Sequence, residues 1–334
     1  MKPLTAWAVE TSELTKDYSV GFWRRRRKRA LDDLTLGVEQ GEIFGLLGPN
    51  GAGKTTTLKI FLRLVYPSSG TARILGRSLD DLSMHARIGY LPENPSFYDH
   101  LTAREFLTYT AELFGLTGAG RRRRVNDLIG RVGLGESGDL ALRKYSKGMI
   151  QRLGIAQALV NDPELIFLDE PMSGLDPLGR REVRDLILEL RRAGKTVFFS
   201  THILSDAETL CDRVAILHRG RLHGVGDLRE ILMAPAAATE LVIERPSPAI
   251  LEKLKPYIRS VVQTGDRVRL EISAEHDTAR VLEVALREGA RVVSLNPVKA
   301  SLEEYFMAHL GHDAPSGAPS DTEDAEPAKS RAQS

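Results

Sequence analysis

A glycine-rich segment has the spacing of a phosphate-binding loop. It consists of Gly48, Pro49, Asn50, Gly51, Ala52, Gly53, Lys54 and Thr55, and it follows the apolar run Ile43 to Leu47. Glycines let the backbone curl so that successive N–H groups point at phosphate oxygens, and the helix expected next, over 56–64, adds the positive end of its dipole. Lys54 would lie along the β- and γ-phosphates and the Thr55 hydroxyl on Mg²⁺. With the adjoining Thr56, the segment predicts a site for a nucleoside triphosphate and Mg²⁺.

Two carboxylates after another apolar run could complete this site. The run Leu165 to Leu168 is followed by Asp169 and Glu170. Asp169 at a strand end can hold Mg²⁺ through water, and Glu170 can direct a second carboxylate to the γ-phosphate, where water could attack. The alternative is that both acids only end a strand with solvated charge. Two acids in sequence after an apolar run, in a chain with a phosphate loop, favour the catalytic interpretation.

The elements that would position these residues form a parallel α/β pattern. Between Ala8 and about Val225, helical patterns alternate with apolar runs at 43–47, 165–168, 196–200 and 213–217. The runs are continuous, as expected of strands buried on both faces by crossover helices.

A second unit follows the break around Pro235. Its pattern is strand 241–244, helix 248–257, strands 260–264 and 267–272, helix 277–287 and strand 291–296. This order predicts a small α+β domain with the ferredoxin-like βαββαβ topology. We expect domains at 8–233 and 239–310, and a disordered tail at 311–334, where large apolar residues are missing.

The composition excludes some classes of protein. Among 334 residues, 46 Lys and Arg balance 45 Asp and Glu, for a net charge of +1, so no nucleic-acid partner is expected. No signal-peptide pattern and no run of about 18 apolar residues is present, which favours a cytoplasmic location. The single cysteine, Cys211, is interpreted as a buried small hydrophobe rather than a catalytic thiol.

Several further motifs resemble those of the ABC transporter ATPase family. Tyr145 to Met149, which includes Ser146, Lys147 and Gly148, resembles the family signature and precedes Asp169 by a helix. Ser173 to Asp176 resembles the D-loop, and His202 occupies the switch-histidine position after a strand. Tyr18 resembles the aromatic residue that stacks on adenine. A lone tyrosine or histidine would more often be structural, but the order and spacing of the set favour the family.

The resemblance implies a fold, an activity and partners. The fold is a P-loop NTPase ABC ATPase cassette with a helical subdomain at about 94–160, and the activity is hydrolysis of ATP with Mg²⁺ by Glu170 and His202. Ser146 and Gly148, at a helix N-terminus, would meet the γ-phosphate held by a second ATPase subunit, most simply in a homodimer. A polytopic membrane subunit would dock on the helical insert and the Q-loop, which places the chain at the cytoplasmic face of a membrane.

Three positions depart from the usual family pattern. Glu93 stands at the Q-loop glutamine, where it could offer an oxygen to Mg²⁺ but adds negative charge near a phosphate. Met149 replaces the last signature glutamine, and Lys147 replaces a glycine. The form Tyr-Ser-Lys-Gly-Met is similar to one common among exporter ATPases with a C-terminal domain, and 301–306 resembles the short helix that closes such domains.

Two basic runs have no role in this scheme. Arg24 to Arg29 is expected in a hairpin loop, and Arg121 to Arg124 forms the second run. Both can be solvated surfaces. The sharper interpretation of the first is contact with anionic lipid, and nucleic acid is a third alternative.

Two functions other than transport are possible for an ABC-like ATPase. An ABC ATPase acting on DNA or the ribosome would usually have two cassettes or long coiled-coil inserts, whereas this chain has one phosphate loop and no sustained heptad pattern. A nucleotide-gated regulatory module with little turnover is disfavoured by Glu170.

Overall fold

The apolar runs form a six-stranded sheet that carries the phosphate loop. The computed structural model describes residues 6–20, 26–232, 238–273, 277–298 and 302. The sheet order is β10-β9-β3-β8-β7-β6, in which only β10 pairs antiparallel. Its strands are β3 (Ile43–Leu47), β6 (Ile88–Leu91), β7 (Leu165–Asp169), β8 (Thr196–Thr201), β9 (Arg213–His218) and β10 (Arg221–Asp227). Every residue of β3, β7 and β8 is buried, as their continuous apolar sequences predict.

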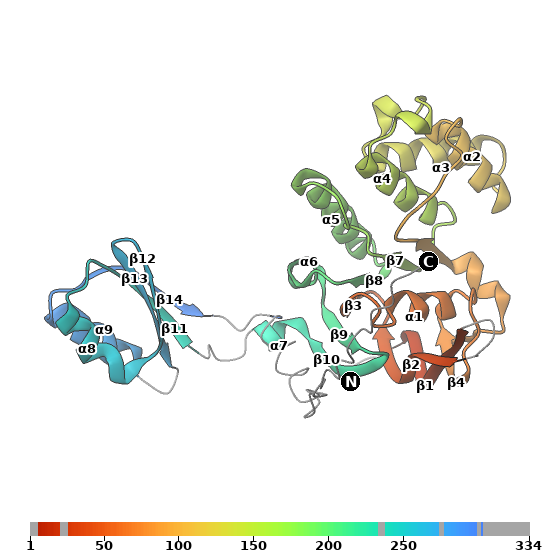
Figure 1. Cartoon of the computed structure of the whole chain (residues 1–334). Helices are drawn as coiled ribbons and strands as arrows, with labels where there is room; N and C mark the ends of the chain where they lie inside the picture. Colours follow the sequence, from red (N-terminus) through yellow and green to blue (C-terminus); the bar gives the residue numbers. More distant parts are fainter. Residues whose placement is uncertain (1–5, 21–25, 233–237, 274–276, 299–301, 303–334) are drawn as a thin grey trace, which may run out of the picture.

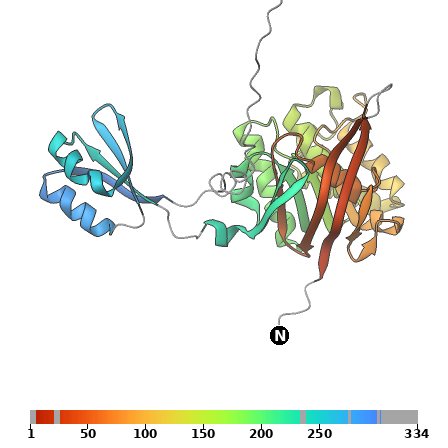
Figure 2. The ribbon, with the colours of Figure 1, turned by 60° about the horizontal axis from the view of Figure 1, so that its bottom comes forward.

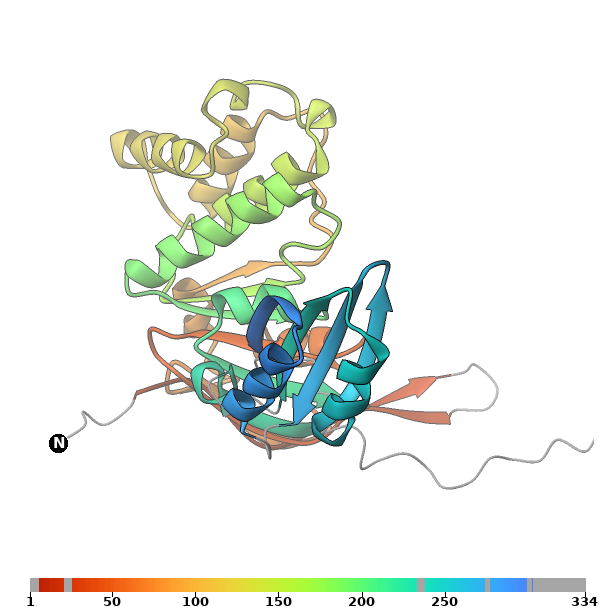
Figure 3. The ribbon, with the colours of Figure 1, turned by 90° about the vertical axis from the view of Figure 1, so that its left-hand side faces the viewer.

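An antiparallel sheet, which the sequence did not predict as a separate element, covers one face. Its order is β2-β1-β4-β5, and its strands are β1 (Trp7–Val20), β2 (Arg26–Glu39), β4 (Ser69–Ile74) and β5 (Arg77–Ser78). One apolar cluster joins this sheet to helix α1 (Lys54–Phe61) and to β3, β7 and β8. Figures 2 and 3 show β1 and β2 as a long hairpin whose far end extends beyond its neighbours.

Helices cover the other face of the six-stranded sheet, and three more helices form a group of their own. The helices are α2 (Ala103–Leu113), α3 (Gly118–Arg131), α4 (Lys147–Ala158), α5 (Pro177–Arg192), α6 (Leu204–Leu210) and α7 (Leu228–Leu232). Figure 1 shows α2, α3 and α4 together at one end of this region, within the predicted helical insert. Thr102 and Glu105 form a capping box that fixes the start of α2. No helix in the described part of the chain is long and apolar enough to cross a membrane.

The C-terminal elements have the predicted order and the ferredoxin-like sheet. They are β11 (Ala238–Glu244), α8 (Pro248–Leu254), β12 (Ile258–Thr264), β13 (Arg267–Ser273), α9 (Thr278–Arg287) and β14 (Arg291–Val298). The antiparallel strand order is β12-β13-β11-β14, and these elements have an apolar cluster of their own. The domain boundaries 8–233 and 239–310 remain predictions, and the tail 311–334 lies outside the described residues.

Some local expectations change, and one lies mostly outside the described residues. Helix α1 begins at Lys54 rather than at residue 56, directly after the left-handed Gly53, and ends at Phe61 because Arg63 has a φ of 57°. Arg26 to Arg29 belong to β2 instead of a loop, since they pair with β1. Of the expected helix 301–306 only Leu302 is described. Leu302 is buried in the cluster that includes α6, and its N–H donates to Glu208 Oε1 at 2.9 Å. It therefore packs with the N-terminal region and not with the C-terminal sheet.

Candidate functional site

The segment from Gly48 to Gly53 joins β3 to α1 in a conformation that requires glycine. Gly51 has a φ of 81° and Gly53 a φ of 114°, both in the left-handed region. A Cβ on Gly48 would lie 2.2 Å from the backbone oxygen of Leu217, so a larger residue does not fit there. No described side chain caps the first N–H groups of α1, which leaves them available for an anion.

Lys54, the first residue of α1, is buried beside this loop. Its Nζ donates to the Gly48 carbonyl oxygen at 2.7 Å and lies 3.2 Å from Glu170 Oε1. The side chains of Lys54 and Glu170 are only 6% and 7% exposed. A cation and a carboxylate are thus held together at the start of the helix, where phosphates would bind.

The two acids at the end of β7 have different surroundings. Asp169 Oδ1 accepts a hydrogen bond from Ser200 Oγ at 2.5 Å, whereas buried Asp169 Oδ2 has no hydrogen-bond partner among the described residues. Glu170 has a φ of 48°, which is uncommon for a residue other than glycine and costs energy. Its N–H donates to the Ser200 carbonyl oxygen at 3.1 Å, so β8 holds the strained residue in place.

His202 lies at the end of the neighbouring strand and contacts the same glutamate. Its Nδ1 is 2.9 Å from Glu170 Oε2, and its side chain is 39% exposed while that of Glu170 is buried. Glu170 therefore lies between Lys54 and His202: His202 is within hydrogen-bond distance of Oε2, whereas Lys54 forms an ion pair with Oε1, which accepts no hydrogen bond from the described residues. A carboxylate fixed in this way beside a phosphate loop can accept a proton from a water molecule.

A cavity of about 700 Å³ collects most of the predicted nucleotide-binding residues. Its lining comprises Tyr18, Ser19, Lys28, Arg29, Ala30, Asn50, Gly51, Ala52, Gly53, Lys54, Thr55, Thr56, Glu93 and Glu170. Gly48, Pro49, Asp169 and His202 adjoin these residues without lining the cavity. The β1–β2 hairpin forms one wall and the phosphate loop another, which is the arrangement that an elongated phosphate ester needs.

The residues predicted to hold Mg²⁺ meet a simple test of fit. Thr55 and Glu93 line the cavity. Asp169, which has a carboxylate oxygen without a hydrogen-bond partner among the described residues, directly precedes Glu170 in the sequence, and Glu170 also lines the cavity. Oxygen ligands of this kind suit Mg²⁺, which usually keeps several waters and takes few protein groups. No group of three or more His, Cys, Asp or Glu side chains that could hold a metal occurs in the described part of the chain.

The signature residues lie apart from this cavity. Ser146 is the N-cap of α4 and accepts from the Met149 N–H at 3.3 Å, while Gly148 is in the first turn. Ser146 and Lys147 are exposed, and a Cβ on the D-loop residue Gly174 would lie 2.1 Å from Lys147 Nζ. The signature helix therefore presents its N-terminus to solvent, beside the D-loop of the same chain.

The D-loop residues have local roles. The N–H of Ser173 donates to the Glu170 carbonyl oxygen at 3.1 Å, directly behind the catalytic candidate. Asp176 is the N-cap of α5, and its Oδ1 accepts from the Gly179 N–H at 2.8 Å.

Several residues at or near the site were not predicted for it, Ser19 and Ala30 of the cavity lining among them. Burial raises the pKa of Tyr90 to about 12, with further contributions from the negative charges of two nearby carboxylates. Burial also raises the pKa of Asp206. Lys28 and Arg29 line the cavity although their basic run suggested lipid, and Ser200 holds Asp169. Only the strand register, which pairs Asp169 with Ser200, reveals that contact.

Comparison with known proteins matches both regions to described families. Residues 31–173 match the ABC transporter family, and residues 226–310 match the C-terminal domain of ATP-binding protein DrrA1-3-like proteins. The chain is 46% identical over 310 residues to an ABC transporter ATP-binding protein, sll0415, of Synechocystis, covering 92% of this chain and 86% of that protein.

Two relatives have names that include a compound. The bacitracin transport ATP-binding protein BcrA of Bacillus licheniformis is 42% identical, with 91% of this chain and 97% of BcrA covered. The daunorubicin/doxorubicin resistance ATP-binding protein DrrA of Streptomyces peucetius is 37% identical, with 92% and 93% covered.

Solved structures of similar proteins cover about two thirds of this chain. An ATP-binding subunit of an ABC transporter is 35% identical, with a TM-score of 0.59, over 67% of this chain and 91% of that one. The dimeric bacterial ABC transporter cassette MJ0796 is 27% identical, with a TM-score of 0.61, over 66% and 99%. On this similarity and on the phosphate-loop site, the chain belongs to the family of ABC transporter ATP-binding proteins and has the ATPase cassette fold of that family.

Proposed function

We propose that this chain hydrolyses ATP to drive export through a separate polytopic membrane subunit. The observation that carries the proposal is the Glu170 carboxylate, held between Lys54 Nζ at 3.2 Å and His202 Nδ1 at 2.9 Å beside the phosphate loop. The names of BcrA and DrrA, a transport and a resistance protein, support export of a small natural product or drug.

In the proposed reaction, Glu170 accepts a proton from the water that attacks the γ-phosphorus, while the bond from the γ-phosphorus to the β–γ bridging oxygen breaks and ADP leaves. His202 holds the carboxylate in place and donates a hydrogen bond toward the γ-phosphate. Lys54 and the free N–H groups of α1 balance the charge of the β- and γ-phosphates. Each of these groups is fixed by a strand end or a helix start, so little reorganisation is needed.

Mg²⁺ is the metal that we assign to the reaction. Thr55 would bind it directly, Asp169 through the oxygen that lacks a partner, and Glu93 from the Q-loop position. When bound, the ion supplies positive charge to the β- and γ-oxygens.

A second ATPase subunit would complete the site. Ser146, Lys147, Gly148 and Met149 do not line the cavity of their own chain, and the α4 N-terminus is suited to an anion from elsewhere. The dimeric MJ0796 cassette supports a pair, and we propose a homodimer in which each signature helix meets the γ-phosphate held by the other subunit.

The membrane subunit would dock beside the helical group, at the cytoplasmic face of the membrane. A groove of about 290 Å³ runs between α2, α4 and β6, and Phe114, 45% exposed, lies on its rim. The other lining residues are Leu62, His85, Ile88, Gly89, Tyr90, Thr110, Gln157, Ala158 and Asn161. A short amphipathic helix is the expected occupant of such a groove.

Contact with anionic lipid through Arg24 to Arg29 is a separate proposal, supported by few residues of this run. Arg24 and Arg25 lie outside the described residues, and Arg29 is bound by Asp17 and Asp32. Lys28 lines the nucleotide cavity. Among the described residues, the lipid proposal therefore depends mainly on the exposed Arg27.

ATP turnover measured alone and with candidate membrane subunits in vesicles tests the transport proposal. The membrane subunit is expected to stimulate turnover, and Phe114→Asp is expected to abolish the stimulation but not the basal rate. Leu286→Asp, which alters an exposed residue of α9 in the C-terminal unit, is the matched control. Stimulation by nucleic acid, with none by any membrane protein, would contradict transport.

A further inference from the structure

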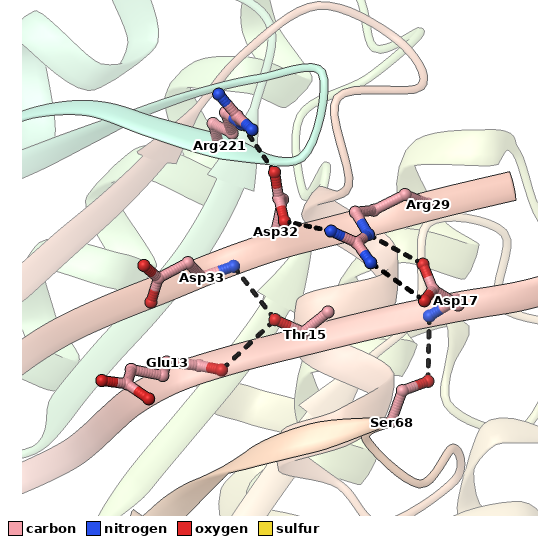
Figure 4. Close-up of polar contacts among 8 residues, drawn as sticks. All are labelled: Glu13, Thr15, Asp17, Arg29, Asp32, Asp33, Ser68 and Arg221. Carbon is pink, nitrogen blue, oxygen red and sulfur yellow. Dashed lines mark hydrogen bonds and ion pairs between the residues drawn. The ribbon is translucent and has the colours of Figure 1, made fainter.

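Four charged side chains of alternating sign connect three strands beside the nucleotide cavity (Figure 4). Arg29 of β2 binds both carboxylate oxygens of Asp17 of β1, with Nε–Oδ1 at 2.9 Å and Nη2–Oδ2 at 3.2 Å. The third arm of the guanidinium donates to Asp32 Oδ1 at 2.7 Å. Arg221, at the start of β10, donates to Asp32 Oδ2 at 2.6 Å. Each of the three guanidinium nitrogens of Arg29 thus donates to one of two carboxylates of its own chain.

Backbone hydrogen bonds connect the same chain of charges to the phosphate loop. The N–H of Gly220, in the β9–β10 turn, donates to the carbonyl oxygen of Ala52 in the loop at 2.8 Å. The Gly220 carbonyl oxygen accepts from the Asp32 N–H at 2.8 Å. Gly220 has a φ of 84°, and a Cβ there would lie 2.8 Å from the Ala30 carbonyl oxygen. The turn therefore fits closely between the phosphate loop and β2.

The other end of the chain of charges lies next to Tyr18. The N–H of Asp17 donates to Ser68 Oγ at 3.0 Å, so Asp17 is held through its backbone as well as its carboxylate. The pairing register shifts between Lys16 and Asp17, with Ala30 as the additional residue on β2, and such bulges redirect side chains next to binding sites. Lys16 Nζ lies 5.1 Å from the centre of the Tyr18 ring.

We infer that Arg29 is a positioning residue for adenine recognition: through Asp17, Asp32 and Arg221 it fixes the distance between Tyr18 and the phosphate loop. The inference rests on the proposed ATP site and assigns a role to the end of the basic run. Adenine and triphosphate lie at opposite ends of one ligand, so the base contact is effective only when the two walls are correctly spaced.

Stability alone does not account for this arrangement. Arg29 is 53% exposed, and exposed ion pairs usually contribute little to folding. Arg29 binds one carboxylate in a bidentate manner and reaches a second, a geometry that lysine cannot reproduce. The chain of contacts also joins segments 189 residues apart in sequence, from Asp32 to Arg221.

The test compares ATP with inorganic tripolyphosphate, which has the phosphates without the base. For Arg29→Gln, the Kd of ATP should rise about tenfold, because stacking on a base has this order of magnitude, and that of tripolyphosphate should change by less than about twofold. The KM for ATP should rise more than kcat falls. Asp17→Asn should reproduce the effect, and the double variant should add nothing, since both remove one contact.

Arg77→Gln is the control, because Arg77 lies in β5 of the same antiparallel sheet, also binds an aspartate, Asp81, and does not line the cavity. It should change neither affinity. Tyr18→Ala separates the positioning role of Arg29 from the proposal that adenine binds at Tyr18. If Tyr18→Ala weakens the binding of ATP but not of tripolyphosphate, while Arg29→Gln weakens the binding of both ligands equally or of neither, the role of Arg29 is wrong and the adenine site at Tyr18 is supported. If Tyr18→Ala leaves the ratio of the two affinities unchanged, both are wrong.

Discussion

His202 Nδ1 lies 2.9 Å from Glu170 Oε2, across the ends of the adjacent parallel strands β8 and β7. The contact exists because Glu170 has a left-handed backbone, with a φ of 48°, and because its N–H is bound by Ser200. The ends of β7 and β8 position both side chains, and the other carboxylate oxygen of Glu170, Oε1, forms an ion pair with Lys54. Lys54 and His202 therefore position the proposed general base, Glu170, before a substrate binds.

Gly48→Ala should disrupt the phosphate loop. The new methyl group would lie 2.2 Å from the Leu217 carbonyl oxygen, so the loop must move, at a cost of about 1–3 kcal/mol of folding free energy. We expect ATP affinity to fall by about tenfold or more, measured by calorimetry. Gly130→Ala in α3, where a Cβ meets nothing within 4 Å, should instead stabilise by about 0.5–1 kcal/mol and leave ATP affinity unchanged. Equal effects of the two variants would contradict the crowding argument.

Ser146→Ala separates a helix cap from a contact between subunits. Ser146 caps α4 through the Met149 N–H, and Ser247 caps α8 in the same way through the Ile250 N–H. Each alanine variant should lose about 1 kcal/mol of stability. Only Ser146→Ala should also lower ATP turnover and ATP-dependent dimerisation, measured by light scattering. If Ser247→Ala reduces turnover as strongly, capping alone explains the result.

Asp206→Asn should raise the melting temperature at neutral pH. The Asp206 side chain is buried with one oxygen unpartnered, and burial raises its pKa, although Arg180 and Arg184 act in the opposite direction. A carboxyl whose pKa is higher in the folded state contributes stability below its unfolded pKa of about 3.9, and this is lost as the pH rises through the folded pKa.

The Asp206→Asn variant should therefore melt a few degrees above the original chain at pH 7, which corresponds to a gain on the order of 1 kcal/mol in the free energy of unfolding. This difference in melting temperature should shrink toward pH 4. Asp185→Asn, on the exposed side of α5, is the control and should change little. Calorimetry across this pH range gives the comparison. A lower melting temperature for Asp206→Asn at pH 7 would show that the two arginines outweigh burial.

Local patterns were sufficient to predict much of the fold and of the site. The loop Gly48 to Thr55, the acids after β7 and His202 after β8 each follow a continuous apolar strand, and parallel strands bring their carboxyl ends to one edge. The order of elements after Ala238 likewise predicted the sheet order β12-β13-β11-β14.

What the sequence did not reveal depends on pairing between distant segments. The antiparallel sheet was missed because bulges interrupt the alternation along β1 and β2. Arg29 looked like part of a solvated or lipid-binding run, since its partners Asp17, Asp32 and the Arg221 turn meet it only in three dimensions. Ser200 reaches Asp169 through the register of β7 and β8.

The rate of ATP hydrolysis by Glu170→Gln tests the central claim most directly, with Glu164→Gln as its control at the other end of β7. Glu164 binds Arg87 at the surface, so its variant should retain turnover. Glu170→Gln should bind ATP as tightly as the original chain and hydrolyse it about a hundredfold more slowly or worse, as expected for loss of a general base. Turnover by Glu170→Gln that matches the Glu164→Gln rate would contradict the account.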